Sequence, residues 1–239
     1  IISILWIIKE GFILHKDYSK DNYAYFLELN TENGNVVDGL RLFKPYFEQY
    51  QRWRDKGVDL AKNVVAEDTD VVILSLDIKE YYYNVGFNPN LQVEVHKRIA
   101  SGLGVNSLLF TQMIFRINET YQTKCPVDSK AIIPIGILSS GILANWYLKD
   151  FDSRIKEELS PAYYGRYVDD ILIVLSNTKI SKDFDNKKFK SPLESFLNKF
   201  FIERNIFDAV PDDPNKSIQK RELTYHYKKD DKIRIQKEK

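Results

Sequence analysis

The chain has 239 residues, of which 44% are apolar and 29% charged, a balance that excludes an intrinsically disordered protein and allows one large folded unit. Its net charge of +1 does not by itself indicate a nucleic-acid partner. The single cysteine, Cys125, excludes an internal disulfide and is typical of proteins in a reducing, cytoplasmic compartment.

The N-terminal quarter alternates between apolar runs and turn signals. Its first eight residues (IISILWII) are apolar but about half as long as a membrane-spanning helix, so we expect a buried element and no membrane partner. Residues 22–30 (NYAYFLELN) are followed by an Asn-Gly turn at 33–34, which predicts a β-hairpin. Between 44 and 66, apolar residues recur three and four apart, which predicts a helix or a helix pair broken near Gly57.

The remaining elements can also be read from periodicity. Residues 71–78 (VVILSLDI) read as a strand, and residues 90–118 as helices with a break around Gly102 and Gly104. Residues 139–154 keep one apolar face and predict a helix. Further along, the spacing predicts a helix over 193–201 and two strands, 223–227 and 232–235, about a polar turn.

Three carboxylates occur where apolar strands end or meet. Asp169 and Asp170 lie between two apolar stretches, and Asp77 ends the strand at 71–78. An unpaired charge on a buried strand is costly unless a cation faces it. Carboxylates are the ligands that Mg²⁺ prefers, and the three histidines lack zinc-like spacing, so the pattern predicts a two-metal nucleotidyl-transfer site. An Asp-Asp pair alone is common in ordinary polar turns, and the matching Asp77 strand is what favours catalysis.

Taken in order, these segments resemble the motifs of the reverse transcriptase family. Residues 77–82 (DIKEYY) resemble its first carboxylate motif, residues 134–145 (PIGILSSGILAN) its central Pro-Gln-Gly helix motif, and residues 167–170 (YVDD) its Tyr-x-Asp-Asp box. The resemblance covers about residues 71–175. It implies an α+β palm-and-fingers polymerase fold, with an antiparallel palm sheet packed on helices.

The resemblance also implies an arrangement of lobes along residues 1–239. The fingers would comprise about 1–70 and 86–133, and the palm about 71–85 and 134–239. A thumb is absent or lies outside this chain.

The family's metal ligands correspond to Asp77, Asp169 and Asp170, with the backbone of Ile78 also facing the metal and the triphosphate. The implied cofactor is a pair of Mg²⁺ ions, for which Mn²⁺ can substitute. All three carboxylates are implied to be catalytic through these ions.

Four further positions are implied to bind substrate. Tyr82 matches the steric gate that excludes a 2′-hydroxyl, and the less favoured alternative is that Tyr81, Tyr82 and Tyr83 serve only as aromatic packing. Gly136 would let the backbone approach substrate or template. Arg54 is a candidate contact for the triphosphate, and Lys239 a candidate for neutralising the leaving pyrophosphate.

The implied function is RNA-directed DNA synthesis, with an RNA template, a DNA product and dNTPs as partners, and with an oligomer or a partner domain completing the enzyme. Two departures stand out: Ile135 replaces the usual Gln of Pro-Gln-Gly, and the Arg-Pro-rich finger motif is absent. These features look more like the bacterial abortive-infection and unknown-group reverse transcriptases of phage defence, and imply a bacterial cytoplasmic protein. The alternatives are a template-independent or RNA-directed RNA nucleotidyltransferase, or a non-catalytic palm-fold assembly module.

Overall fold

The computed structural model describes residues 1–30, 32–37, 41–125, 132–178, 191–211 and 223–236, which fall into two compact units. Unit 1 combines residues 1–52, 80–152 and 166–168. Unit 2 combines residues 53–79, 153–165 and 169–239. Both units are therefore discontinuous in sequence, and the chain passes from one to the other within the helices α3 (Tyr46–Ala66) and α8 (Lys149–Leu159).

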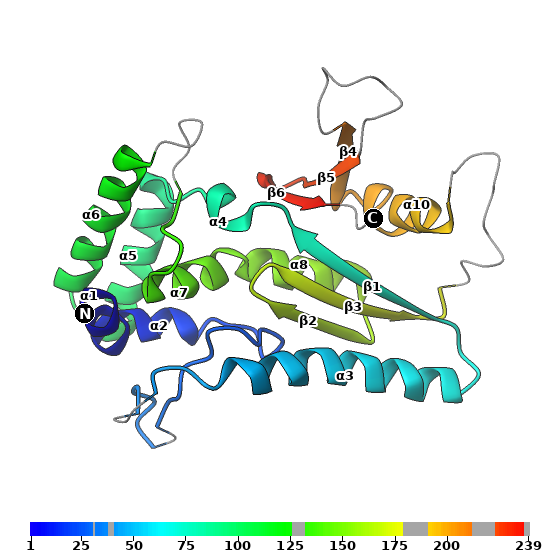
Figure 1. The fold of residues 1–239 in the computed structure, drawn as a ribbon, viewed down its shortest axis with the longest axis horizontal. Helices are drawn as coiled ribbons and strands as arrows, with labels where there is room; N and C mark the ends of the chain where they lie inside the picture. Colours follow the sequence, from blue (N-terminus) through cyan, green and yellow to red (C-terminus); the bar gives the residue numbers. More distant parts are fainter. Residues whose placement is uncertain (31, 38–40, 126–131, 179–190, 212–222, 237–239) are drawn as a thin grey trace. The chain divides into compact units, whose positions relative to one another are not determined.

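Unit 1 is mainly helical, as Figure 1 shows in blue and green. Its elements are α1 (Ile2–Trp6), the π-helical η1 (Ile7–Gly11), α2 (Phe12–His15), α4 (Tyr81–Asn84), α5 (Pro89–Leu103), α6 (Leu109–Lys124) and α7 (Leu138–Tyr147). The α1 helix packs against α6 and α7, and α2 packs against α5 and α7. The core of the unit lies between these helices.

Local signals set the bounds of α5, where the sequence predicts a break. The Asn88 side chain accepts a hydrogen bond from the Leu91 amide at 3.1 Å and so caps the N-terminus, with Pro89 in the first turn. Gly104 ends the helix in the left-handed region, with φ of 67°. The predicted helix–break–helix is confirmed.

A buried carboxylate closes the N-terminus of α6 from another helix. Glu10, on η1, accepts hydrogen bonds from the amides of Phe110 and Thr111, at 3.1 and 2.6 Å, and from the Thr111 hydroxyl at 2.6 Å. The first amides of a helix have no partner within it, and the helix dipole favours a negative charge there. Glu10 therefore ties the N-terminal helix to α6.

Unit 2 is built on a six-stranded sheet in the order β2-β3-β1-β6-β5-β4. The strands are β1 (Val71–Ile78), β2 (Tyr163–Tyr167), β3 (Asp170–Ser176), β4 (Phe207–Pro211), β5 (Leu223–Tyr227) and β6 (Asp230–Gln236). β1 pairs antiparallel with β3 and β6, and β5 pairs antiparallel with β4 and β6 (Figure 1). Helices and an antiparallel sheet together make the fold α+β, as predicted.

Helical segments cover parts of this sheet. The α3 helix approaches it at Gly57, where an added Cβ would lie 2.6 Å from Leu172 on β3. Toward the other edge, α10 (Pro192–Leu197) continues into the π-helical η2 (Asn198–Ile202), and Phe201 stacks on Phe207 of β4 with ring centroids 4.9 Å apart. The predicted helix over 193–201 is thus an α-helix that changes to a π-helix.

Three local predictions are corrected. The N-terminal apolar run is not a buried element, because Ile1, Ile4 and Ile8 are exposed while Trp6 and Ile7 are buried. The helix at 44–66 is one uninterrupted helix, and the single helix at 139–154 is instead α7 and α8, separated at Leu148. At the last break, the fully buried Leu148 departs from helical geometry, with φ of −89° and ψ of 5°.

The predicted hairpin near residue 33 exists in a shorter form. Leu29 and Val36 form a single antiparallel bridge, and the Asn30 amide donates to the Asn35 carbonyl at 2.8 Å. Gly34 takes a φ of 68°, which the turn requires. Within the described residues, no helix combines the length and the apolarity needed to cross a bilayer.

Candidate active site

Strand register brings two of the predicted carboxylates together. In the antiparallel pair of β1 and β3, Asp77 lies directly opposite Asp170. Directly opposed residues share one face of a sheet, with Cβ atoms about 4.5–5.5 Å apart. Asp169 is next to this pair, and its carbonyl accepts a hydrogen bond from the Ile78 amide at 3.2 Å. All three carboxylates therefore belong to unit 2 and to one end of the β1–β3 pair.

The environment of Asp77 differs from the buried strand that the sequence suggests. Along β1, Leu74, Leu76 and Ile78 are buried, whereas Ser75 is exposed and Asp77 half-buried. The strand thus has one core face and one open face, and Asp77 is on the open face. Ligands from solvent can reach the Asp77 carboxylate. The expectation that a fully buried charge needs a cation to neutralise it therefore does not apply to Asp77.

Asp169 is held in a tight hairpin turn. Val168 and Asp169 are the only two residues between β2 and β3. Val168 has a φ of 59°, in the left-handed region that two-residue hairpins need and β-branched side chains avoid. A residue in this conformation costs of order 1–3 kcal/mol, and it persists only where its surroundings hold it.

The donor set at this site suits a hard cation. Carboxylate and carbonyl oxygens are the ligands that Mg²⁺ prefers, and opposed like charges such as Asp77 and Asp170 destabilise a sheet unless they are neutralised. Among the described residues, no group of three or more His, Cys, Asp or Glu side chains converges to hold a metal ion. The chain therefore offers a fitting but partial ligand set, of the kind that substrate phosphates and water complete.

Two predicted substrate-binding residues lie in unit 1. Tyr82, on α4, is half-buried, and its hydroxyl lies 3.5 Å from the Tyr25 hydroxyl. Its carbonyl accepts a hydrogen bond from the Ile133 amide at 3.4 Å, which ties α4 to the segment leading to Gly136. Gly136 has a φ of 85°, and the space where a Cβ would lie is open, so conformation is what favours glycine here.

The structure gives less support to the substrate-binding roles predicted for the two remaining residues, Arg54 and Lys239. Arg54 lies on α3 in unit 2, is exposed, and forms an ion pair with its neighbour Asp55 at 2.7 Å. Lys239 lies outside the described residues. The β6 strand that precedes it pairs with β1, however, and places Gln236 opposite Asp77.

A buried polar cluster beside the Val168 turn was missed by sequence reasoning. Arg166 on β2 is 1% exposed and forms a bidentate ion pair with Asp152, both bonds being 2.7 Å long. It also donates to the side chain of Asn145 at 2.9 Å. A charged residue inside an apolar strand was the available signal, but its partners are on two different helices.

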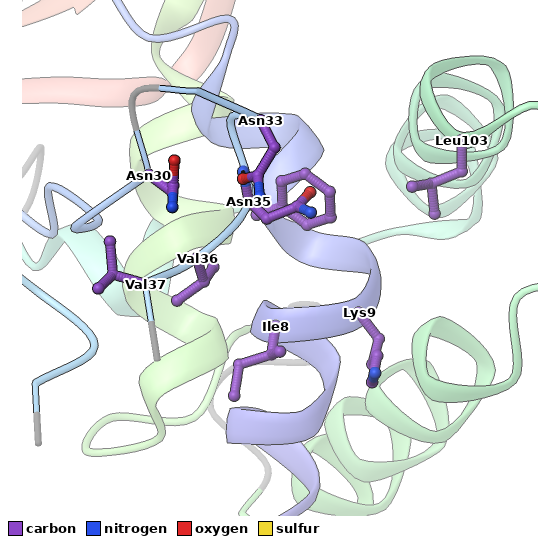
Figure 2. A pocket seen from close by; sticks show the side chains of 9 residues that line it. Ile8, Lys9, Asn30, Asn33, Asn35, Val36, Val37 and Leu103 are labelled. Carbon is purple, nitrogen blue, oxygen red and sulfur yellow. The ribbon is translucent and has the colours of Figure 1, made fainter. Parts of the chain in front are cut away.

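One hollow of about 570 Å³ lies elsewhere in unit 1. Figure 2 shows it between the N-terminal helix, the turn at 30–37 and Leu103 of α5. Three asparagines and Lys9 line it together with apolar side chains. None of the predicted site residues is part of this lining.

Comparison with protein families decides the kind of protein. The family model described as reverse transcriptase (RNA-dependent DNA polymerase) matches residues 30–204, which is well over half of the chain. The chain belongs to the reverse transcriptase family. The matched range of this reverse transcriptase includes Asp77, Tyr82, Gly136, Asp169 and Asp170. A search of curated proteins found no match.

Membership of this family indicates a polymerase that binds nucleic acid and nucleotides. Reverse transcriptase activity in general is therefore the activity that the domain supports.

Proposed function

We propose that this protein is an RNA-directed DNA polymerase that adds dNTPs to a 3′-hydroxyl by two-metal nucleotidyl transfer. The observation that carries the proposal is the register of β1 and β3, which sets Asp77 opposite Asp170 and next to Asp169. These three carboxylates, with the carbonyl of Ile78, are the proposed metal ligands. Asp77 lies on the open face of β1, and the side chains of all three are half-buried rather than buried, so a hard cation from solvent can reach them, which supports this role.

The proposed reaction is an in-line displacement. The primer 3′-oxygen forms a bond to the α-phosphorus of the dNTP, the bond between the α-phosphorus and the bridging oxygen breaks, and pyrophosphate leaves while the hydroxyl proton passes to solvent. Bound Mg²⁺, or Mn²⁺ in its place, supplies activation of the hydroxyl and neutralisation of the leaving group. Asp77, Asp169 and Asp170 would hold the ions, with Asp169 oriented by the tight turn that it forms with Val168.

The substrate-binding roles are proposed from the family motifs. Tyr82 excludes a 2′-hydroxyl, and Gly136 lets the backbone approach substrate or template. Arg54 contacts the triphosphate and Lys239 neutralises pyrophosphate. The half-buried, partly accessible ring of Tyr82 and the open space at Gly136 support the first two roles.

Replacement of one carboxylate tests the proposal. In Asp169→Asn, we expect Mg²⁺-dependent incorporation of labelled dNTPs to fall to background, because a neutral amide is a poor ligand for a hard cation. The free energy of unfolding should change by less than about 1 kcal/mol, because the half-buried side chain keeps its shape. A primer-extension assay and urea denaturation measure the two quantities.

The matched control is Asp59→Asn on α3, where an exposed aspartate forms a surface ion pair with Lys62 at 3.5 Å. This variant should extend primer like the wild type. Unchanged incorporation by Asp169→Asn would contradict the assignment and would favour the non-catalytic assembly module.

A second candidate activity, synthesis with little template dependence, is favoured by Ile135. This residue replaces the family's usual Gln, is 53% exposed, and precedes Gly136 at the entrance to α7. An apolar side chain cannot make the polar contacts of an amide near an incoming nucleotide. Incubation with single dNTPs, with and without added RNA, separates templated from untemplated synthesis.

We also propose that the protein acts in bacterial phage defence in the cytoplasm, together with a further copy or a partner domain. The support is the Pro-x-Gly motif with Ile135 and the absence of the Arg-Pro-rich finger motif. Expression of the wild type in a bacterial host should reduce phage plaques, and expression of Asp169→Asn should not.

A further inference from the structure

The Arg166 guanidinium connects the hairpin turn of the candidate site to two helices. Its Nε and Nη2 donate to the two carboxylate oxygens of Asp152 on α8, at 2.7 Å each. Its Nη1 donates to the Asn145 side-chain oxygen on α7 at 2.9 Å, and Nη2 to the Asn145 carbonyl at 3.2 Å. The same Nη1 donates to the Val168 carbonyl at 2.8 Å. These partners all lie in unit 1.

The backbone of Arg166 is anchored as firmly as its side chain. Its amide donates to the Asp21 carbonyl at 2.8 Å, and its carbonyl accepts from the Tyr23 amide at 2.9 Å. The Asn145 amide group donates in turn to the Ala24 carbonyl at 3.1 Å. The segment 21–24 therefore holds both the Arg166 backbone and the Asn145 side chain that the guanidinium contacts.

The hydrogen bond from Arg166 reaches the carbonyl of Val168, a residue whose backbone conformation is strained. Val168 holds a φ of 59°, which a β-branched residue does not adopt without an external constraint. Its carbonyl belongs to the peptide unit whose nitrogen is that of Asp169. A planar peptide cannot twist, so fixing this oxygen also fixes the direction in which the chain enters Asp169.

Stability alone does not account for the cluster. A buried ion pair is often no more stabilising than apolar side chains of the same volume, because both charges lose their hydration. What a planar guanidinium adds is several hydrogen bonds of fixed direction. A requirement for a defined turn geometry explains why this strand carries an arginine among apolar residues.

We propose that Arg166 is a positioning residue for the catalytic turn: held by Asp152 and Asn145, it fixes the Val168 carbonyl and thereby the geometry with which Asp169 and Asp170 meet the metal ions. This inference rests on the proposed nucleotidyl-transfer function. In this role Arg166 contacts neither substrate nor metal. It acts through its hydrogen bond to the backbone carbonyl of Val168.

Arg166→Lys is the central variant, because it keeps the charge and removes the planar fork. We expect kcat to fall about 10- to 100-fold, as for other residues that orient metal ligands, while KM for dNTP changes less than about threefold. Mn²⁺ binding, measured by electron paramagnetic resonance without nucleotide, should weaken about tenfold. A merely structural role would leave the metal affinity of the folded protein unchanged.

Arg98→Lys is the matched control. Arg98 also forms a bidentate ion pair with a carboxylate in unit 1, donating to Asp17 at 2.6–3.0 Å. Asp17 is not part of the turn formed by Val168 and Asp169. The variant should keep wild-type kcat and Mn²⁺ affinity, because the pair of Arg98 with Asp17 is not part of the turn. Equal losses of kcat in both variants would overturn the proposal.

A second variant tests whether Arg166 acts through the turn. Val168→Gly removes the strain that the clamp is proposed to hold, because glycine adopts a positive φ at little cost. In the double variant Arg166→Lys/Val168→Gly, measured at a temperature where the protein is folded, kcat should recover at least about threefold over Arg166→Lys. Failure to recover, with folding intact, contradicts a role through the turn.

The two proposals fail in different ways. If wild-type protein shows no incorporation, or if Asp169→Asn incorporates normally, the proposed function is wrong. If the wild type is active, Asp169→Asn is inactive, and folded Arg166→Lys matches the wild type in kcat and Mn²⁺ affinity, the positioning role is wrong and the function stands.

Discussion

Three consecutive tyrosines show how differently neighbouring side chains are used. Tyr81 is 3% exposed, and its hydroxyl donates to the Ala144 carbonyl of α7 at 2.5 Å. Burial raises the pKa of Tyr81 well above its usual value, so the phenol stays protonated. Tyr83 is exposed, and Tyr82 is half-buried. Packing thus accounts for Tyr81, whereas part of the Tyr82 side chain stays accessible to solvent.

If Tyr82 is the gate against ribonucleotides, its ring rather than its hydroxyl is what matters. Tyr82→Ala should raise the ratio of rNTP to dNTP incorporation about 10- to 100-fold, because the space for a 2′-hydroxyl opens. Tyr82→Phe should keep the wild-type ratio. Tyr83→Ala is the control from the exposed neighbour. Single-nucleotide incorporation kinetics measure the ratio, and an unchanged ratio in Tyr82→Ala would assign the ring to packing.

At the scale of elements, the helix α3 continues through Gly57, and the sheet lies against the helix at this residue. An added Cβ would lie 2.6 Å from Leu172 on β3 and 3.0 Å from Tyr163 on β2. The Tyr163 hydroxyl also donates to the Trp53 carbonyl of the same helix at 2.6 Å. Glycine at position 57 therefore allows α3 to lie close to the sheet, and α3 stays helical through this residue.

Gly57→Ala separates these two effects. Helix propensity alone predicts a gain of about 1 kcal/mol, but overpacking against Leu172 costs about 1–3 kcal/mol. We expect a net loss of up to about 2 kcal/mol in the free energy of unfolding by urea denaturation. Lys62→Ala, at an exposed position of the same helix, should stay within about 0.5 kcal/mol of the wild type. A more stable Gly57→Ala would contradict the close contact.

These elements also show what sequence patterns can predict. Apolar periodicity and local signals such as Gly104 were sufficient for α5 and α6, and the apolar runs beside Asp77 and Asp170 were sufficient to expect strands there. The antiparallel sheet was implied only by the resemblance to reverse transcriptases. The close approach of the sheet to α3 at Gly57 involves residues far away in the chain, and no local signal marks the break at Leu148. The partners of Arg166 come from two helices and a loop, so no local pattern contains them.

For the whole molecule, the division into two units has consequences for how stability is measured. Two of the three tryptophans, Trp6 and Trp146, belong to unit 1, and Trp53 belongs to unit 2. Chains with more than one compact unit need not unfold in a single step. A change that alters the stability of one unit alone can show whether the two units unfold together. Protonation of the buried His15 in unit 1 is such a change.

His15 lies in the core of unit 1, 6% exposed, where its Nε2 accepts a hydrogen bond from the Leu27 amide at 3.2 Å. The Phe26 ring meets it edge-on at 4.6 Å. Burial, with a smaller effect of the positive charge of Lys44, lowers the pKa of His15 from 6.5 to about 4. Between these values the unfolded chain binds a proton that the folded chain does not, so stability falls as the pH decreases.

The expected size of this effect is about 2 kcal/mol between pH 7.5 and pH 5. His15→Gln keeps an acceptor for the Leu27 amide but cannot titrate. On going from pH 7.5 to pH 5, the free energy of unfolding of the variant should therefore decrease by about 2 kcal/mol less than that of the wild type. Urea denaturation followed by tryptophan fluorescence at both pH values measures the difference. Because Trp6 and Trp146 report on unit 1, the pH-dependent transition should be the one that these residues detect. Parallel losses in the two proteins would show that His15 is not kept neutral by the fold.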